Sequence, residues 1–155
     1  MGPDDDLYGD VGPLDVVALE SVQLVFRGDD GLVDSTQSAF DSVIDPTRLR
    51  VRFQDGIGDA EWARFDIKWY RSGFYNFHHV DGNDVQFRFD YHPKNGANER
   101  HYHPPPDAPS DPDLVEKSCI TAAEPDVVAR AVLGLWRRAY DEDDFSQLNT
   151  ATNPP

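Results

Sequence analysis

Side chains that could act on a phosphodiester are concentrated in one stretch of this chain. All five histidines lie between residues 62 and 103. Within this stretch Arg88, Asp90 and His92 are spaced two apart, so on a β-strand all three side chains would point to one face. Guanidinium groups bind phosphate oxygens in a fork, and imidazole exchanges a proton near neutral pH. The spacing therefore predicts a polar strand face that can bind phosphate.

A second group of histidines and an arginine follows a few residues later. RNA supplies its own nucleophile, the 2′-hydroxyl, so a metal-independent ribonuclease needs only a general base, a general acid and a cation for the charged phosphorane. We expect His92 and either His101 or His103 to act as base and acid. The predicted catalytic residues are Asp90, which would orient a histidine, His92, His101 and His103, and the predicted phosphate-binding residues are Arg88 and Arg100.

The same histidines permit a metal site as an alternative. His101 and His103 would share one face of an extended segment, and His92 or Asp90 could be a third ligand. Three protein ligands with one open position are typical of catalytic zinc. The first hypothesis needs no cofactor, whereas the alternative needs zinc or another divalent metal at His92, His101 and His103.

The charge of the chain is strongly acidic but unevenly distributed. The net charge is −15, with 23 Asp, 6 Glu, 11 Arg and 3 Lys, a balance typical of halophilic and in particular archaeal proteins from salty cytoplasm. An aromatic fraction of 12% is too high for a disordered chain. Residues 48–103 carry nine cations and eight acids, and the remainder carries five cations and 21 acids. Residues 48–103 thus lack the acidic excess of the rest of the chain, and this region can still bind RNA despite the net charge of −15.

The elements that must position these residues are mostly strands. Apolar and polar residues alternate in 48–53, 63–70, 74–80 and 85–92, and the last two are joined by a turn at 80–84. Residues 21–27 suggest a further strand, residues 34–45 a short helix, and residues 125–140 a long amphipathic helix with Pro125 in its first turn. We expect the large aromatic residues in the core: Trp62, Trp69, Phe87, Phe89 and Trp136.

These elements predict an α+β fold, in which a curved antiparallel β-meander of about four to six strands packs on a long C-terminal helix. We expect a single domain over residues 1–140 and a disordered acidic and polar tail over 141–155. Cys119 is the one cysteine, which excludes an internal disulfide and a cysteine zinc cluster. No apolar run reaches the roughly 18 residues of a membrane span, and the acidic N-terminus is unlike a secretory signal, so we expect a cytoplasmic protein without a membrane partner.

From Tyr70 onward the order of features resembles the TumE-like toxins of prokaryotic toxin–antitoxin systems. The shared pattern is an aromatic hairpin, then a segment rich in His and Pro, then a C-terminal helix. The matching residues are Tyr75, Phe77, His78, Asp81, Phe87, Arg88, Phe89, Asp90, Tyr91, His92, Pro93, Arg100, His101, Tyr102, His103 and Pro104, followed by 125–140. The chain differs in having a spaced pair of histidines where such toxins often have a compact run.

The resemblance implies a toxin that acts as a nuclease and is neutralised by a co-encoded antitoxin. The leading hypothesis is therefore a toxin-like, metal-independent endoribonuclease whose partners are an RNA substrate and a cognate antitoxin. Two alternatives remain open. One is a non-enzymatic protein-binding or adaptor protein whose histidine-rich face is an interface, and the other is the metal-binding protein described above.

Overall fold

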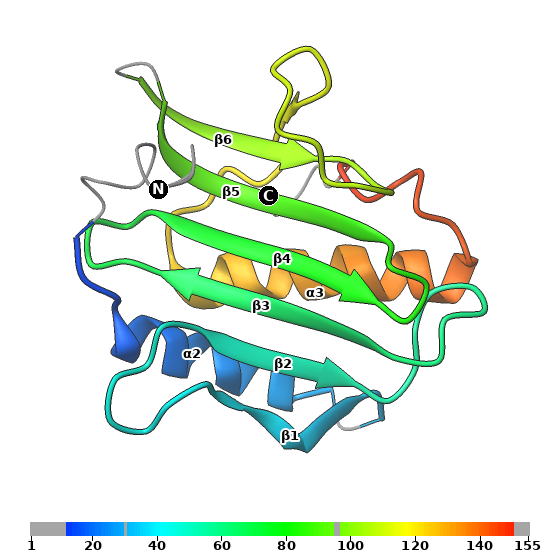
Figure 1. Cartoon of the computed structure of the whole chain (residues 1–155), viewed down its shortest axis with the longest axis horizontal. Helices are drawn as coiled ribbons and strands as arrows, with labels where there is room; N and C mark the ends of the chain where they lie inside the picture. The colour runs from blue at the N-terminus through cyan, green and yellow to red at the C-terminus, as the bar shows by residue number, and fades with distance from the viewer. Residues whose placement is uncertain (1–11, 30, 95–96, 151–155) are drawn as a thin grey trace.

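The described part of the chain forms one antiparallel sheet with two helices on the same side of it (Figure 1). The computed structural model describes residues 12–29, 31–94 and 97–150. The seven strands lie side by side in chain order, so each strand pairs with its neighbours in the sequence. The elements are α2 (Val16–Arg27), β1 (Val33–Phe40), β2 (Leu49–Phe53), β3 (Ala63–Trp69), β4 (Tyr75–Asp81), β5 (Gln86–Lys94), β6 (Ala97–His103), β7 (Glu116–Lys117) and α3 (Pro125–Glu142).

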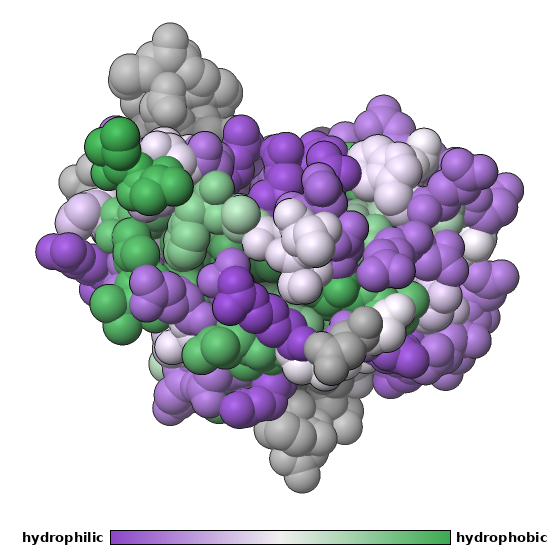
Figure 2. All heavy atoms as spheres, turned by 90° about the horizontal axis from the view of Figure 1, so that it is seen from below, coloured by the Kyte–Doolittle hydropathy of each residue, from purple (hydrophilic) through white to green (hydrophobic). Residues whose placement is uncertain are grey.

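The predicted α+β meander on a C-terminal helix is confirmed, but the sheet has more strands than the four to six expected. One extra strand is β1, which replaces the helix predicted over 34–45. That prediction used Val43 and Ile44 as part of an apolar helix face, whereas both are almost fully exposed, at 100% and 96%, in the β1–β2 loop. Figure 2 shows apolar patches among polar side chains on the side of the molecule formed by β1 and α2.

Helix α2 was also predicted wrongly, as a strand over 21–27. The residues it buries include Ala18, Leu19, Val22 and Phe26, which recur at helical spacing. Asp15 caps the helix by accepting a hydrogen bond from the backbone N–H of Ala18 at 3.0 Å. Val22, Leu24 and Phe26 alternate with other residues as in a strand. The predicted strand covered only the second half of the helix, where too few residues show the helical spacing.

The hydrophobic core lies between the sheet and the two helices. Odd-numbered residues of β2 to β5 point into it, as the alternating pattern predicted. Helix α3 contributes Val128, Val132 and Trp136, and the Trp136 indole stacks on Phe53 with ring centroids 4.0 Å apart. Burial of large side chains of this kind stabilises a fold by roughly 1.5–3 kcal/mol each. Both helices cover one face, so the other face is free to carry polar groups.

The chain remains ordered beyond residue 140, which differs from the predicted tail. Helix α3 continues to Glu142, and the following residues fold back so that Leu148 is 1% exposed in the core. The side chain of Asn149 accepts a hydrogen bond from the backbone N–H of Cys119 at 2.7 Å. Acidic composition suggested a tail, yet one leucine and these polar contacts suffice to dock the segment. Residues 151–155 of the predicted tail lie outside the described residues.

The β4–β5 hairpin, predicted with its turn at 80–84, is confirmed. The carboxylate of Asp81 accepts hydrogen bonds from the backbone N–H groups of Asn83 (2.8 Å) and Val85 (3.1 Å), which fixes the turn. Asp84 adopts a positive φ of 61° within it. The turn sets the register of β5 and thereby the face on which its polar residues lie. Neither described helix is long and apolar enough to cross a membrane.

Candidate active site

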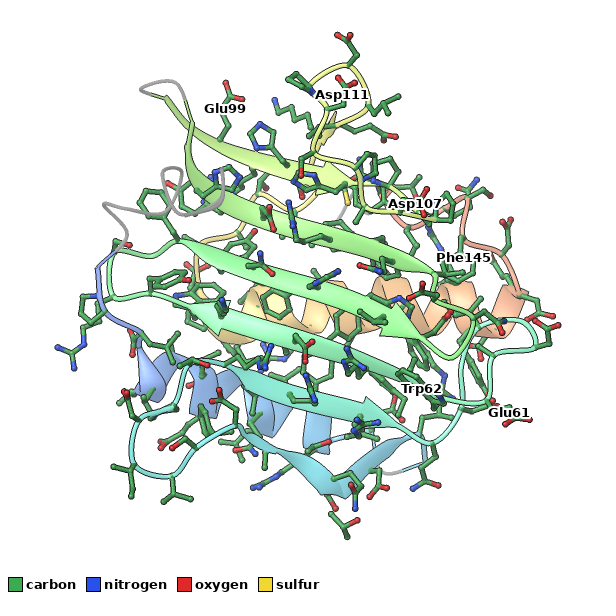
Figure 3. All side chains as sticks on the ribbon, viewed as in Figure 1. Glu61, Trp62, Glu99, Asp107, Asp111 and Phe145 are labelled. Carbon is green, nitrogen blue, oxygen red and sulfur yellow. The ribbon has the colours of Figure 1, made fainter. Side chains whose placement is uncertain are left out.

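Strand β5 presents Arg88, Asp90 and His92 on the face opposite the helices, as the sequence predicted. Phe87 and Phe89 alternate with them and are completely buried on the helix side. The strand therefore separates a packed apolar side from a polar side, and the polar side chains project from the sheet toward the viewer in Figure 3.

The register between β5 and β6 brings the second histidine group to the same face. His103 lies opposite Arg88, His101 lies opposite Asp90, and Glu99 lies opposite His92. Directly opposed side chains of antiparallel strands have Cβ atoms about 4.5–5.5 Å apart, which is close enough for direct contact. The His92 and His101 rings are 5.5 Å apart between centroids, and those of His101 and His103 are 6.4 Å apart. The expected convergence of His92, His101 and His103 is thus present.

Asp90 is the centre of this group and is completely buried. Its Oδ2 accepts a hydrogen bond from Nε of Arg88 at 2.9 Å and lies 3.0 Å from Nε2 of His103. Nε2 of His92 is 3.6 Å from the same oxygen. One carboxylate oxygen therefore faces a guanidinium and two imidazoles, and we call Arg88, Asp90, His92 and His103 the Asp90 cluster.

The charges around Asp90 keep its carboxyl ionised. Burial by itself raises the pKa of Asp90, because a charge is costly away from water. The hydrogen bond from His103 and the positive charges of Arg88, His103 and His92 outweigh this effect, and the pKa lies below the usual value for Asp. The cluster is consequently a buried ion group in which one anion is shared by several cationic partners.

His103 is fixed at both of its ring nitrogens. Its Nδ1 is 2.7 Å from the carbonyl oxygen of Pro109, which can only accept, so Nδ1 donates. Its Nε2 lies 3.0 Å from the Asp90 carboxylate and 3.3 Å from Nη2 of Arg88, so both ring nitrogens have polar partners. Pro109 belongs to the segment from Pro104 to Asp113, which leaves β6 and closes over His103, leaving this histidine 4% exposed.

His101 forms a second acid–imidazole pair beside the Asp90 cluster. Its Nε2 is 2.9 Å from the carboxylate of Glu99, whose side chain is 58% exposed. When Nε2–H donates to Glu99, Nδ1 carries the lone pair, and among the described residues this buried Nδ1 has no hydrogen-bond partner. Sequence reasoning missed Glu99, although its position two residues before His101 would place both side chains on one face of a strand.

The structure separates Arg100 from the other predicted site residues. Arg100 lies opposite Tyr91 and follows the alternation of β6 to the helix side of the sheet. Its guanidinium stacks over the Tyr91 ring, with Cζ 4.0 Å from the ring centroid. Arg100, which was predicted with Arg88 to bind phosphate, therefore lies on the opposite face of the sheet from Arg88, because a strand residue an odd number of positions from His101 and His103 points to the other face.

The adjacent histidines of β4 divide between the two faces, as expected for consecutive strand residues. His79 is buried in the core and stacks on Phe87 with ring centroids 4.4 Å apart; burial lowers its pKa to about 3, so it is neutral. His78 lies on the polar face and donates from Nε2 to the side-chain oxygen of Gln86 at 2.9 Å. Burial also lowers the pKa of His78.

Three residues of the Asp90 cluster could also hold a metal ion. Ligand atoms of Asp90, His92 and His103 lie within 4.8 Å of one another. This set differs from the predicted alternative of His92, His101 and His103, because Asp90 takes the place of His101. Three such ligands suit a catalytic zinc, but Arg88 donates to the same carboxylate oxygen and its Nη2 lies 3.3 Å from Nε2 of His103. The positively charged guanidinium of Arg88 therefore already contacts two of the three atoms that would bind a metal ion.

Comparison with protein-family models matches residues 26–138 to toxin TumE. The match covers 113 of the 155 residues, from the end of α2 through the whole sheet and most of α3. The chain belongs to the TumE toxin family. The TumE match confirms the resemblance seen from Tyr70 onward and extends it toward the N-terminus. Comparisons with curated proteins and with solved structures find no match.

Membership of the TumE family makes this chain a toxin of a toxin–antitoxin system and implies a cognate antitoxin as its partner. The matched region includes every residue of the Asp90 cluster together with Glu99 and His101. The chemistry of this TumE protein is therefore best sought on the polar face of β5 and β6, where its titratable groups meet.

Proposed function

We propose that this TumE toxin is an endoribonuclease that cleaves RNA without a metal ion, on the polar face of β5 and β6. The observation that carries the proposal is the convergence of Arg88, His92 and His103 on the single buried carboxylate of Asp90. A cation for phosphate and histidines for proton transfer are the groups that cleavage by the 2′-hydroxyl requires.

In the proposed reaction a histidine takes the proton of the 2′-hydroxyl, and the 2′-oxygen attacks the adjacent phosphorus. The bond from phosphorus to the 5′-oxygen breaks, and a second histidine gives that oxygen a proton. The products are a 2′,3′-cyclic phosphate and a 5′-hydroxyl, with atoms and charges balanced. His101, whose buried Nδ1 has no hydrogen-bond partner among the described residues, suits the base, and His103, which contacts Asp90, suits the acid, with His92 beside them.

Arg88 is the group that a substrate phosphate would meet first. Its side chain is 16% exposed, whereas the side chains of His92 and His103 are 4% and 5% exposed. The proposed chemistry therefore requires the segment from Pro104 to Asp113 to move when RNA binds, since the carbonyl of Pro109 holds His103. Movement of a covering loop to complete or expose a site is common among enzymes.

The direct test is the integrity of cellular RNA after induction of the toxin. Wild-type protein should arrest growth and leave RNA fragments with 2′,3′-cyclic phosphate and 5′-hydroxyl ends, and purified protein should produce them in the presence of a chelator. His101→Ala and Arg88→Ala should abolish both effects. Arg130→Ala, which removes an exposed arginine from α3 on the other side of the sheet, is the matched control and should remain toxic. Intact RNA during growth arrest would overturn the proposal.

The second candidate is a metal-dependent site, favoured by the approach of Asp90, His92 and His103 within 4.8 Å. It predicts stoichiometric zinc or another divalent metal in protein purified without chelator, and loss of that metal in His92→Ala. His101→Ala would retain the metal, because His101 is not in this ligand set. Activity that is abolished by a chelator and restored by metal would replace the metal-independent mechanism.

A further inference from the structure

The polar face of the sheet continues well beyond the Asp90 cluster. The register joins side chains of five neighbouring strands into one row, because each pairs directly with the next. The row consists of Arg50, Asp66, His78, Arg88 and His103. Neighbouring strands are about 4.8 Å apart, so four intervals give a row of about 19 Å. This length is sufficient for several nucleotides of an extended strand.

Cations predominate along this face, although the protein as a whole carries a charge of −15. On β2 to β5 up to Asp90, the described side chains that share the face include five cations and two carboxylates. The cations are Arg50, Arg52, Arg64, Lys68 and Arg88, and the carboxylates are Asp66 and Asp90. The middle strands β2 to β5 thus carry more cations than carboxylates on the side that the helices leave uncovered, while Asp34 of β1 lies opposite Arg52.

Some of these cations form ion pairs with carboxylates of the same face, and others do not. Asp66 pairs with Arg50 at 2.7 Å and with Arg64 at 3.2 Å. Within the described ranges, Arg52 and Lys68 form no ion pair. An arginine and a lysine without a carboxylate partner can bind phosphate oxygens without first breaking an internal contact.

Trp62 lies at the far end of the same face, where β3 begins (Figure 3). The aromatic pattern predicted it in the core, yet it is half-buried between two guanidinium groups. The Cζ atoms of Arg52 and Arg64 are 5.6 and 5.5 Å from its ring. The indole also lies against the β4–β5 turn, where a Cβ on Gly82 would be 3.0 Å from its Nε1. A rigidly seated tryptophan beside arginines is a stacking platform for a nucleobase.

We propose that single-stranded RNA lies across this face, with one base stacked on Trp62 and its phosphates on Arg52 and Lys68, and so reaches the Asp90 cluster. This inference rests on the proposed ribonuclease function and names the substrate class of that site. A stacking base replaces one cation–π contact and releases a guanidinium to the next phosphate. Double-stranded RNA keeps its bases stacked on one another and cannot use the tryptophan in this way.

The test is binding of a short, fluorescein-labelled, 2′-O-methylated single strand, which lacks the nucleophile and cannot be cleaved. Wild-type protein should bind it, and Trp62→Ala should weaken binding by between about 5-fold and 150-fold, the loss expected for one base–aromatic stack. Trp62→Phe should restore most of the affinity and, with a melting curve matching wild type, shows that the fold is intact. Arg52→Ala should lower the salt dependence of binding by about one phosphate contact, and Arg130→Ala should not.

The outcomes also separate this inference from the proposed function. If wild-type protein cleaves RNA but Trp62→Ala binds the single strand as well as wild type, the proposed RNA position across Trp62 is wrong and the proposed ribonuclease function is retained. If Trp62→Ala and Arg52→Ala weaken RNA binding but no cleavage occurs, the proposed RNA position is retained and the proposed ribonuclease function is wrong. Absence of RNA binding, together with loss of antitoxin binding in Arg52→Ala, would make this face a protein interface and overturn the inference.

Discussion

Replacement of Asp90 by asparagine is the sharpest test of the buried ion group. The change preserves the shape of the side chain but removes the negative charge that lies against Arg88, His92 and His103. Loss of one partner from a buried ion pair usually destabilises a protein by about 3–5 kcal/mol, because the remaining charge stays buried. The Arg88 side chain is 16% exposed, so water can partly solvate the guanidinium that is left unpaired, and we expect the lower end, about 3 kcal/mol.

The assay is urea unfolding at neutral pH, followed by tryptophan fluorescence. Asp126→Asn is the matched control, because it breaks an exposed Asp–Arg pair on α3 at 3.1 Å and should cost less than about 1 kcal/mol. Molar salt should reduce the effect of Asp126→Asn more than that of Asp90→Asn, since buried pairs are less screened. A loss of less than about 1 kcal/mol for Asp90→Asn would refute the view that the carboxylate holds the cluster together.

The same variant gives a pH dependence of known sign. The pKa of Asp90 is lower in the folded protein than in the unfolded chain, so its contribution is complete above the unfolded value of about 3.9. It is lost as the pH falls through the folded value. The difference in stability between wild type and Asp90→Asn should therefore narrow below about pH 4, and a difference that widens there would contradict the reasoning.

Two further predictions concern the core. Burial lowers the pKa of His79 to about 3, so between about pH 6.5 and pH 3 the unfolded chain binds a proton that the folded protein does not. As the pH falls through that window, the free energy of unfolding should decrease by up to about 1.4 kcal/mol per pH unit. His79→Phe should reduce this slope in urea titrations. Equal slopes in both proteins would count against it. Leu148→Ala should cost about 2–5 kcal/mol, because Leu148 is 1% exposed, whereas Leu114→Ala, at a site 54% exposed, should change stability by less than about 0.5 kcal/mol; similar melting temperatures for the two variants would show that the segment after α3 is not docked.

The sequence predicted the strands of the central meander and the face on which the cluster lies, because both follow from period-2 alternation. Arg88, Asp90 and His92 needed only that rule. The same rule, applied to β6, would have put Arg100 on the helix side with Tyr102. The prediction instead grouped Arg100 with its neighbouring histidines, as though proximity in sequence meant proximity in space.

Other features depended on information that local patterns do not hold. Trp62 looked like a core residue by type, and its place beside Arg52 and Arg64 depends on the register between β2 and β3. Helix α2 imitated a strand in its second half, and β1 imitated a helix through apolar residues that proved to be in a loop. The exchange of His101 for Asp90 in the possible metal set arose from side-chain distances, which spacing alone does not give.

The chain order of the strands has a consequence for synthesis. Every strand pairs with the one made just before it, so the sheet can assemble hairpin by hairpin as the polypeptide leaves the ribosome. Helix α3 follows the sheet in the chain, and until it is made Phe53 lacks the Trp136 indole that stacks on it in the folded protein. A nascent or truncated chain would therefore expose the apolar face of the sheet to solvent, and docking of α3 protects the toxin from aggregation.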